Sequence, residues 1–453
     1  MPRRKMPVRI QPAAKKPALE KRSAKTIDRL LGMKDIVPSE YRYFSAIRNK
    51  AASLAELYSF NAIKTPVIES PELYKKSMRN GNDKEIYEVS CEKGEDSVLR
   101  PELTQGILRA YIENNFSELP QPVRLYSIGP VFRREKMQSG RYRESTQFDL
   151  EIIGENKPMA EALLIAAAYN FLRDLQANFQ IQINSIGKAD CRKDYSNKLA
   201  NFYKERGRKS KLCNNCKKNL GKNMMALLDC KEEACQRTLA EAPQLADFLS
   251  DESREHFAKV LEYLDELAIP YNFNPYLVRG LAYYNDTVFE IWPVGDDGIA
   301  NSKQALAGGG RYDNLVESLG GRPTPSVGLA FGLERVVARV KDRTELPDYK
   351  QEVVFLAQLG DQAKIKSLML FEELRRAGFN VRQSFSTDSL KNQMEEAARL
   401  KSKVSLILGK KEVMDETIML RDMESGVQET VAFKKIKDRL EKKVNRKEGV
   451  IYG

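Results

Sequence analysis

The chain has 453 residues, of which 42% are hydrophobic and 30% charged, a composition typical of a globular protein with two or three domains. Its net charge is +12, but residues 1–26 hold nine basic residues against one glutamate, so overall basicity is weak evidence for a nucleic-acid partner. The chain contains no apolar run of about 18 residues and no apolar signal segment, so we expect a cytoplasmic protein without membrane spans.

Residue patterns after the basic N-terminal tail predict a first domain over residues 27–345. In chain order they predict a helix at 41–60, a strand at 62–70, a turn and helix at 97–114, an antiparallel hairpin at 121–155, a helix at 158–176, strands at 276–292, a glycine-rich turn at 307–310 and a strand-to-helix transition at 325–340.

A linker-like stretch at 341–352 precedes a second pattern. Strand and helix segments alternate β-α-β-α-β from "VVFLA" to "VSLILG", which predicts a small, mainly parallel α/β domain over 350–440. A second basic tail follows at 441–453.

The hairpin at 121–155 brings arginines and carboxylates together. Arg133 ends its first strand, Arg141 and Arg143 follow the loop "EKMQSG", and the two-residue period of the returning strand puts Gln147, Asp149 and Glu151 on one face. Such a set suits a ligand that carries a phosphate and a polar group. A surface hairpin with cross-strand ion pairs is the alternative.

Three further segments combine glycine, charge and aromatic residues. In "LRPELTQG", Glu102 and Thr104 would hold an ammonium group, although Thr104 is also a good helix cap. "AGGGRYDNL" lets a backbone approach a ligand but is no P-loop, and Arg335 opens the last helix of the domain. "RGLAYYNDTVFEI" begins at Arg279 and is either a core strand or a pocket wall.

Four of the six cysteines lie within 23 positions: Cys213, Cys216, Cys230 and Cys235. Two pairs of thiolates would suit a tetrahedral structural zinc site, although the second pair is spaced more widely than usual, and Cys191 is a fifth candidate. Reduced, buried thiols in an inserted region at about 185–265 are the alternative.

Together these segments resemble the histidyl-tRNA synthetases, a family of the class II aminoacyl-tRNA synthetases. "GPVFRREKMQSGRYRESTQFDLEIIG" is similar to motif 2 and "GLAFGLERV" to motif 3 of the class. "LVRGLAYYNDTVFEI" and "AGGGRYDNL" resemble the two segments peculiar to the histidine enzymes, and "ELYSFNAIKTPVIES" stands at the position of motif 1.

The resemblance implies an α+β catalytic domain with an antiparallel sheet and a C-terminal α/β anticodon-binding domain. It also implies a homodimer that joins histidine to the 3′ end of histidine tRNA, with ATP as substrate and Mg²⁺ as the metal ion that binds with ATP.

The resemblance also implies roles for single residues. Arg133 and Arg279 would bind the α-phosphate of ATP as catalytic groups, and Arg335 the terminal phosphates. The histidine substrate would be held by Glu102, Thr104, Gln147, Glu151, Tyr283 and Tyr284, of which Glu151 and Tyr284 would bind the imidazole nitrogens.

The chain departs from the family pattern at Ala282, usually Asp, at Leu103, usually Gly, and at Ser145-Thr146, usually Phe-His. An Asp at 282 could orient Arg279 or a tyrosine, so Ala282 raises the question of reduced activity. Two alternatives to an active ligase are a synthetase-like regulatory subunit of histidine biosynthesis and a non-catalytic RNA-binding relative. The C-terminal domain argues against the first, and Arg133 with Arg279 against the second.

Overall fold

A computed structural model describes residues 27–75, 85–90, 96–134, 141–295, 297–301, 304–341, 352–384 and 388–444. The N-terminal tail, Cys91, the hairpin loop at 135–140, most of the linker and the end of the C-terminal tail lie outside these residues. The chain divides into two compact units, residues 1–346 and 347–453. No helix in the described part is long and apolar enough to cross a membrane.

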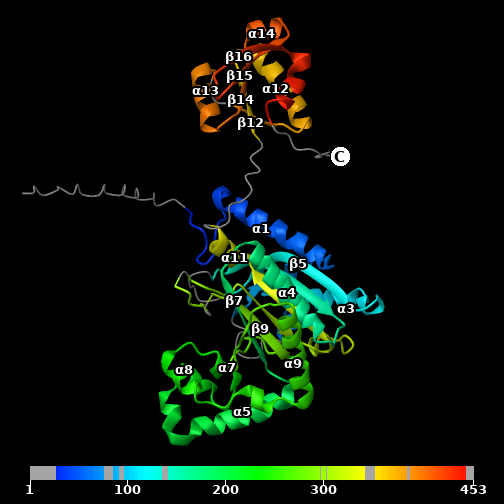
Figure 1. Ribbon diagram of the computed structural model, residues 1–453, viewed down its shortest axis with the longest axis vertical. Coiled ribbons are helices and arrows are strands. Elements are labelled where there is room, and N and C mark those ends of the chain that lie inside the picture. The colour runs from blue at the N-terminus through cyan, green and yellow to red at the C-terminus, as the bar shows by residue number, and fades with distance from the viewer. Residues whose placement is uncertain are drawn as a thin grey trace, which may run out of the picture. The chain divides into compact units, whose positions relative to one another are not determined.

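The first unit is built on a sheet that has eight strands among the described residues, in the order β1-β5-β6-β11-β10-β9-β7-β8. Strands β5, β7 and β9 of this sheet are labelled in Figure 1. The six inner strands pair antiparallel, whereas β1 and β8 join the two edges in parallel. The prediction of an antiparallel sheet is therefore confirmed. The strands are β1 (Asn61–Ala62), β5 (Val123–Phe132), β6 (Glu144–Ile153), β7 (Phe179–Ser185), β8 (Asn272–Phe273), β9 (Asn285–Pro293), β10 (Ala307–Arg311) and β11 (Ser326–Gly332).

One face of this sheet packs against long helices. Phe148, Leu150 and Ile152 alternate along β6 and lie in a core formed with helix residues such as Phe171 and Val336. Gln147, Asp149 and Glu151 therefore point to the opposite face. The helices that complete this core are α1 (Pro38–Leu57), α4 (Met159–Asp174), α9 (Asp251–Glu266) and α11 (Leu333–Val340).

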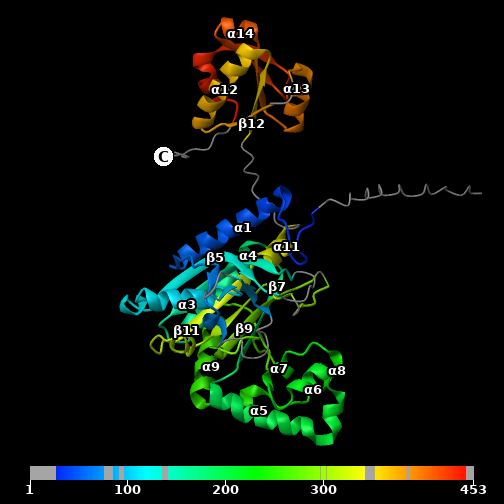
Figure 2. The same cartoon turned by 180° about the vertical axis from the view of Figure 1, so that it is seen from behind.

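The other face carries α3 (Thr104–Glu113), α10 (Leu315–Ser318) and an insertion between β7 and β8. In both ribbon views the insertion forms a lobe of its own below the sheet, which holds α5 to α8 (Figure 2). Its helices are α5 (Ala189–Lys204), α6 (Asn214–Asn219), α7 (Met225–Leu228) and α8 (Glu233–Leu239). A smaller sheet adds β2 (Ile68–Glu69), β3 (Tyr87–Val89) and β4 (Ser97–Leu99), with α2 (Pro71–Lys75) beside them.

The chain's one histidine belongs to a buried ion-pair network. Arg311 on β10 donates two hydrogen bonds of 2.6 and 2.7 Å to the carboxylate of Glu161 on α4. His256 on α9 lies 2.7 Å from the same carboxylate. Because removing one partner of such a pair leaves a buried charge uncompensated, we assign these residues to stability.

Two local predictions were wrong. The expected glycine-rich turn at 307–310 is strand β10, held between β9 and β11. A Cβ on Gly309 would lie 2.2 Å from the carbonyl oxygen of Gly328, so the glycine permits close strand packing. In addition, residues 276–284 are not a strand, since β9 begins only at Asn285.

The second unit contains the predicted β-α-β-α-β order. It comprises β12 (Val353–Gln358), α12 (Asp361–Arg376), β13 (Asn380–Gln383), α13 (Leu390–Arg399) and β14 (Val404–Leu408). These three strands are parallel, and an antiparallel pair that the sequence patterns did not indicate extends the sheet. The added elements are α14 (Lys410–Met414), β15 (Thr417–Asp422), β16 (Gln428–Ala432) and α15 (Ile436–Glu441).

Candidate active site

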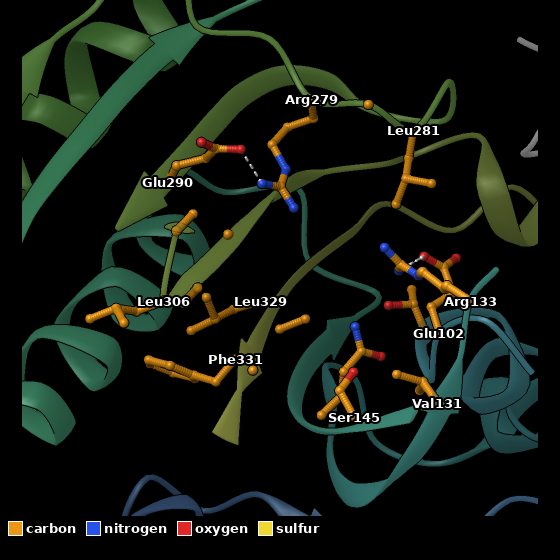
Figure 3. A pocket seen from close by; sticks show the side chains of 18 of the residues that line it. Glu102, Val131, Arg133, Ser145, Arg279, Leu281, Glu290, Leu306, Leu329 and Phe331 are labelled. Carbon is orange, nitrogen blue, oxygen red and sulfur yellow. Dashed lines mark hydrogen bonds and ion pairs between the residues drawn. The ribbon is translucent and has the colours of Figure 1, made fainter. Parts of the chain in front are cut away.

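A cavity of about 370 Å³ opens on the sheet face opposite the long helices. Segments far apart in the sequence line it, which is typical of a site assembled on a rigid sheet. Among the residues that the sequence patterns singled out, those on its wall are Glu102, Thr104, Arg133, Arg141, Gln147, Arg279, Tyr283, Tyr284 and Arg335. Figure 3 shows that Arg279 and Arg133 approach the cavity from different sides.

Arg279 is held by a carboxylate that sequence patterns did not indicate. Its Nη1 donates a hydrogen bond of 2.5 Å to Glu290 on β9, and the indole N–H of Trp292 donates to the other oxygen of Glu290 at 2.8 Å. Burial opposes the charge of Arg279, but the Glu290 carboxylate outweighs burial and raises the pKa of the guanidinium. A fixed, permanent positive charge therefore lies on the cavity wall.

Gly308 provides the space for this guanidinium. A Cβ at Gly308 would lie 2.1 Å from Nη1 of Arg279. The glycines of "AGGGRYDNL" thus admit protein groups into close packing, whereas the sequence suggested close approach to a ligand. Glu290 was missed because the contact needs the loop after Arg279 to fold back on β9, which residue spacing does not reveal.

Arg133 lies beside Glu102 on another part of the wall. Its Nε donates a hydrogen bond of 2.7 Å to the carbonyl oxygen of Pro101, and its Nη2 is 4.0 Å from Oε2 of Glu102. The Glu102 side chain is nearly fully buried, and burial raises the pKa of this carboxyl. Its Oε2 accepts a 3.3 Å hydrogen bond from the hydroxyl of Tyr283, while Oε1 has no hydrogen-bond partner among the described residues.

The cap interpretation of Thr104 is wrong. The residue before helix α3 is Leu103, and no side chain caps that helix. Burial raises the pKa of Glu151, and the hydroxyls of Tyr312 and Thr104 oppose this rise, which places Thr104 toward Glu151. Leu103 itself is fully buried, and its N–H donates to Oε1 of Gln147 at 3.2 Å. The departure from the family's glycine is therefore accommodated by the core.

Three tyrosines surround the inner end of the cavity. The ring centroids of Tyr283 and Tyr284 are 4.6 Å apart, and Tyr312 lies 5.7 and 6.3 Å from them. Glu151 does not line the cavity but lies behind Tyr312, whose hydroxyl donates a hydrogen bond to its Oε2. Tyr312 belongs to the segment "AGGGRYDNL", but the sequence patterns predicted no role for this tyrosine.

Glu151 is fully buried, and burial raises its pKa to about 8. Its Oε1 has no hydrogen-bond partner within the described part of the chain. It faces Gly328 across the β6–β11 pair, where a Cβ would lie 1.7 Å from Oε2. A buried oxygen without a hydrogen-bond partner costs free energy. Oε1 of Glu151 is therefore suited to accept a hydrogen bond from a bound ligand.

Another part of the cavity wall is formed by groups from the motif 3-like segment and the hairpin. Arg335, on the first turn of α11, donates a 2.8 Å hydrogen bond to the carbonyl oxygen of Ala305. Its neighbour Glu334 accepts from the N–H of Thr146 at 2.8 Å. Arg141 lines the cavity, whereas Arg143 points elsewhere and donates to the carbonyl oxygen of Leu31 at 3.1 Å.

A second cavity of about 710 Å³ adjoins the first. Arg279, Gly280, Leu281 and Tyr284 belong to both walls, and Asp229 and Lys231 of the insertion also line both. Ala282 is exposed and lies on the second wall only. The predicted cysteines Cys213 and Cys230 line the same cavity.

Comparison with known proteins finds a matching family model for each unit of the chain. Residues 32–336 match the model described as "Histidyl-tRNA synthetase", and residues 353–443 match "Anticodon binding domain". The histidine–tRNA ligase of Dehalococcoides mccartyi is 37% identical over 91% of this chain and 99% of its own length. That of Thermosipho melanesiensis is 38% identical over 88% and 95%. The apo histidyl-tRNA synthetase of S. aureus superposes with a TM-score of 0.75 at 30% identity, covering 91% and 99% of the two chains.

Proposed function

We propose that this chain, which belongs to the histidyl-tRNA synthetase family, is a histidine–tRNA ligase that activates histidine with ATP and transfers it to the 3′ end of its tRNA. The observation that carries the chemistry is the pair of arginines, Arg133 and Arg279, which reach one cavity from separate segments. Between them the cavity offers carboxylate, hydroxyl and aromatic groups suited to an amino acid.

In the first step, a carboxylate oxygen of histidine attacks the α-phosphorus of ATP. A new O–P bond forms, the bond to the β-phosphate oxygen breaks, and pyrophosphate leaves. Negative charge grows on the non-bridging oxygens during this displacement, and preorganised cations stabilise it. Arg133 and Arg279 supply two such charges, and Arg335 would bind the terminal phosphates.

The substrate histidine would be held at both ends. Glu102 and Thr104 bind the α-ammonium group, where Oε1 of Glu102, which has no hydrogen-bond partner among the described residues, offers an acceptor. Glu151 and Tyr284 bind the imidazole nitrogens, with Tyr283 beside the ring and Gln147 orienting the substrate. The position of Glu151 behind Tyr312 adds that hydroxyl to the imidazole site. Leaving such groups unpaired would reject other amino acids.

In the second step, a hydroxyl of the terminal ribose of tRNA attacks the carbonyl carbon of the adenylate, and AMP leaves. The C-terminal unit, which matches the anticodon-binding model, supports tRNA as the partner. Mg²⁺ would accompany the ATP phosphates, and Glu85 and Glu334 on the cavity wall are carboxylates able to hold it. Glu290 is already paired with Arg279, so we do not assign it to a metal.

We further propose a homodimer that works in the cytoplasm. The motif 1-like segment supports the dimer because Leu57 and Ile68, which lie in it, expose 84% and 52% of their surface. Exposed apolar side chains on one segment are typical of an interface. A role in protein synthesis, with ATP and tRNA as substrates, supports the cytoplasmic location.

ATP–pyrophosphate exchange measured with each amino acid in turn tests the function. We expect exchange that depends on histidine alone, since only histidine satisfies the polar groups around Glu151. Absence of exchange with every amino acid, from a folded protein, would contradict the proposal. Light scattering on the same preparation is expected to give the mass of two chains.

Replacing Ala282 by Asp is expected to change the exchange rate by no more than about twofold, as for most exposed positions. Glu290 already orients Arg279, so a carboxylate at 282 is not needed for that purpose. Steady-state kinetics of Ala282→Asp beside the unaltered chain measure this. A tenfold acceleration would show that the departure from the family pattern does weaken the enzyme.

A further inference from the structure

Four sulfur atoms of the insertion converge on one point. The Sγ atoms of Cys213, Cys216, Cys230 and Cys235 all lie within 4.8 Å of one another, and the four cysteines are free thiols. The Sγ atoms of Cys213 and Cys230 are 3.9 Å apart. A tetrahedral zinc ion with Zn–S bonds of about 2.3 Å separates its sulfur ligands by about 3.8 Å. The thiols are thus close to the spacing that zinc requires.

Backbone hydrogen bonds orient these sulfurs. Cys213 precedes helix α6, and its Sγ accepts from the N–H of Cys216 at 3.4 Å. The N–H of Cys213 donates in turn to Sγ of Cys235 at 3.2 Å. Donors aimed at sulfur favour the thiolate that binds metal and fix the direction of the ligand.

The local structure around the cluster needs such a link. Helices α6, α7 and α8 have six, four and seven residues, lengths at which an isolated helix is unstable in water. Cys216 and Cys235 are buried in their shared core, and Cys213 and Cys230 are partly exposed. A metal ion that joins all three helices would supply the missing stability.

We propose that the four thiolates bind one Zn²⁺ ion, and that this ion, through Cys230, fixes Asp229 and Lys231 on the wall that the active-site cavity and the second cavity share with Arg279. Binding releases the four thiol protons and involves no oxidation. Asp229 and Lys231 flank Cys230 directly and line both cavities, and their side chains form an ion pair of 2.8 Å. One peptide bond therefore separates a metal ligand from each of these wall residues.

The metal site itself does not depend on the proposed function, whereas its effect on the active site rests on that function. Arg279 and Leu281 lie on the wall that the two cavities share with Asp229 and Lys231. A shift of the 229–231 segment would change the shape of the wall next to the catalytic arginine. Misplacing a supporting group by about 1 Å can cost about 100-fold in rate.

The first test is the metal content of the full chain, purified under reducing conditions with zinc present. We expect about one zinc per chain by mass spectrometry of the metal. Cys213→Ser and Cys230→Ser should lose it, and Cys191→Ser, which alters a buried cysteine outside the cluster, should keep it. Titration with Co²⁺ should give the visible absorption of a tetrahedral thiolate site. The zinc site would be rejected if the unaltered chain contained no zinc, or if all the variants contained as much zinc as the unaltered chain.

The second test uses the unaltered chain, because a serine substitution can unfold the insertion locally for reasons other than loss of the metal. Removing zinc with a chelator should expose residues 205–240 to protease and lower histidine-dependent exchange about 10-fold, and added zinc should restore both. Lys231→Ala should raise the KM for ATP, whereas Lys217→Ala, at an exposed position of α6, should not. If the chain binds zinc but shows no ATP–pyrophosphate exchange with or without the metal, the proposed ligase function is rejected and the zinc site is retained. Chelation without effect on cleavage or exchange would overturn the link to the active site.

Discussion

Replacing Arg279 by Gln is expected to lower kcat of histidine-dependent ATP–pyrophosphate exchange about 100- to 1000-fold, the loss typical of removing one preorganised donor from a transition state. The guanidinium is held by Glu290, which is itself held by Trp292, so its position is set before substrate binds. Its charge meets the charge that grows on the α-phosphate. Because that interaction strengthens in the transition state, kcat should fall more than the KM for ATP rises.

Two matched variants separate this effect from a general loss of charge. Arg279→Lys keeps the charge but loses the planar fork, and should recover only part of the rate. Arg237→Gln removes an exposed arginine of the insertion that pairs with Glu233, and should leave the rate unchanged. The shorter glutamine leaves the Glu290 carboxylate without its charge partner, so thermal melting is measured beside kcat to show that the variant is folded. An unchanged kcat in a folded Arg279→Gln protein would remove Arg279 from the catalytic step.

Replacing Glu151 by Gln is expected to raise the KM for histidine about 10- to 100-fold, because a hydrogen bond to a charged acceptor is worth about 1.5–3 kcal/mol. Burial raises the pKa of Glu151 to about 8, so the carboxyl of the empty protein is protonated at neutral pH. The ionised form is the better acceptor for an imidazole N–H. In the unaltered protein, kcat/KM for histidine should therefore rise with pH up to about 8.

The same pKa predicts how stability depends on pH. Between the ordinary carboxyl value of 4.5 and about 8, the folded protein holds a proton that the unfolded chain has lost. By linkage, the stability contributed by this group is complete below pH 4.5 and is lost as pH rises through about 8. The Glu151→Gln variant lacks this carboxyl and therefore does not lose that stability. As pH rises, its melting temperature should increase relative to that of the unaltered protein.

Thermal melting at several pH values, together with histidine kinetics, checks both statements. Glu266→Gln, an exposed position on α9, is the control and should show neither effect. If Glu151→Gln is more stable than the unaltered protein at alkaline pH but binds histidine more weakly, Glu151 serves histidine binding at a cost to stability. A variant with unchanged affinity for histidine would remove it from the imidazole site.

Local patterns predicted much of the candidate site. The two-residue period of strand β6 put Gln147 and Glu151 on one face, and both lie on the side opposite the long helices. The resemblance then pointed to eight residues, among them Arg133 and Arg279, that the structure brings to one cavity. The cap predicted at Thr104 failed because that helix begins one residue earlier than a cap requires.

The sequence by itself determined the residue types and many of the strand and helix periods, because these depend on neighbours along the chain. The fold class of the first domain came from the resemblance to a known family. Only the tertiary structure decided which groups pair: Glu290 with Arg279, Tyr312 with Glu151, and the four sulfurs of the insertion with one another. These contacts follow from the strand order β6-β11-β10-β9 and from loops that fold back on it. Residue spacing carries no record of that order, since it arises when non-local strands meet and bury a common core.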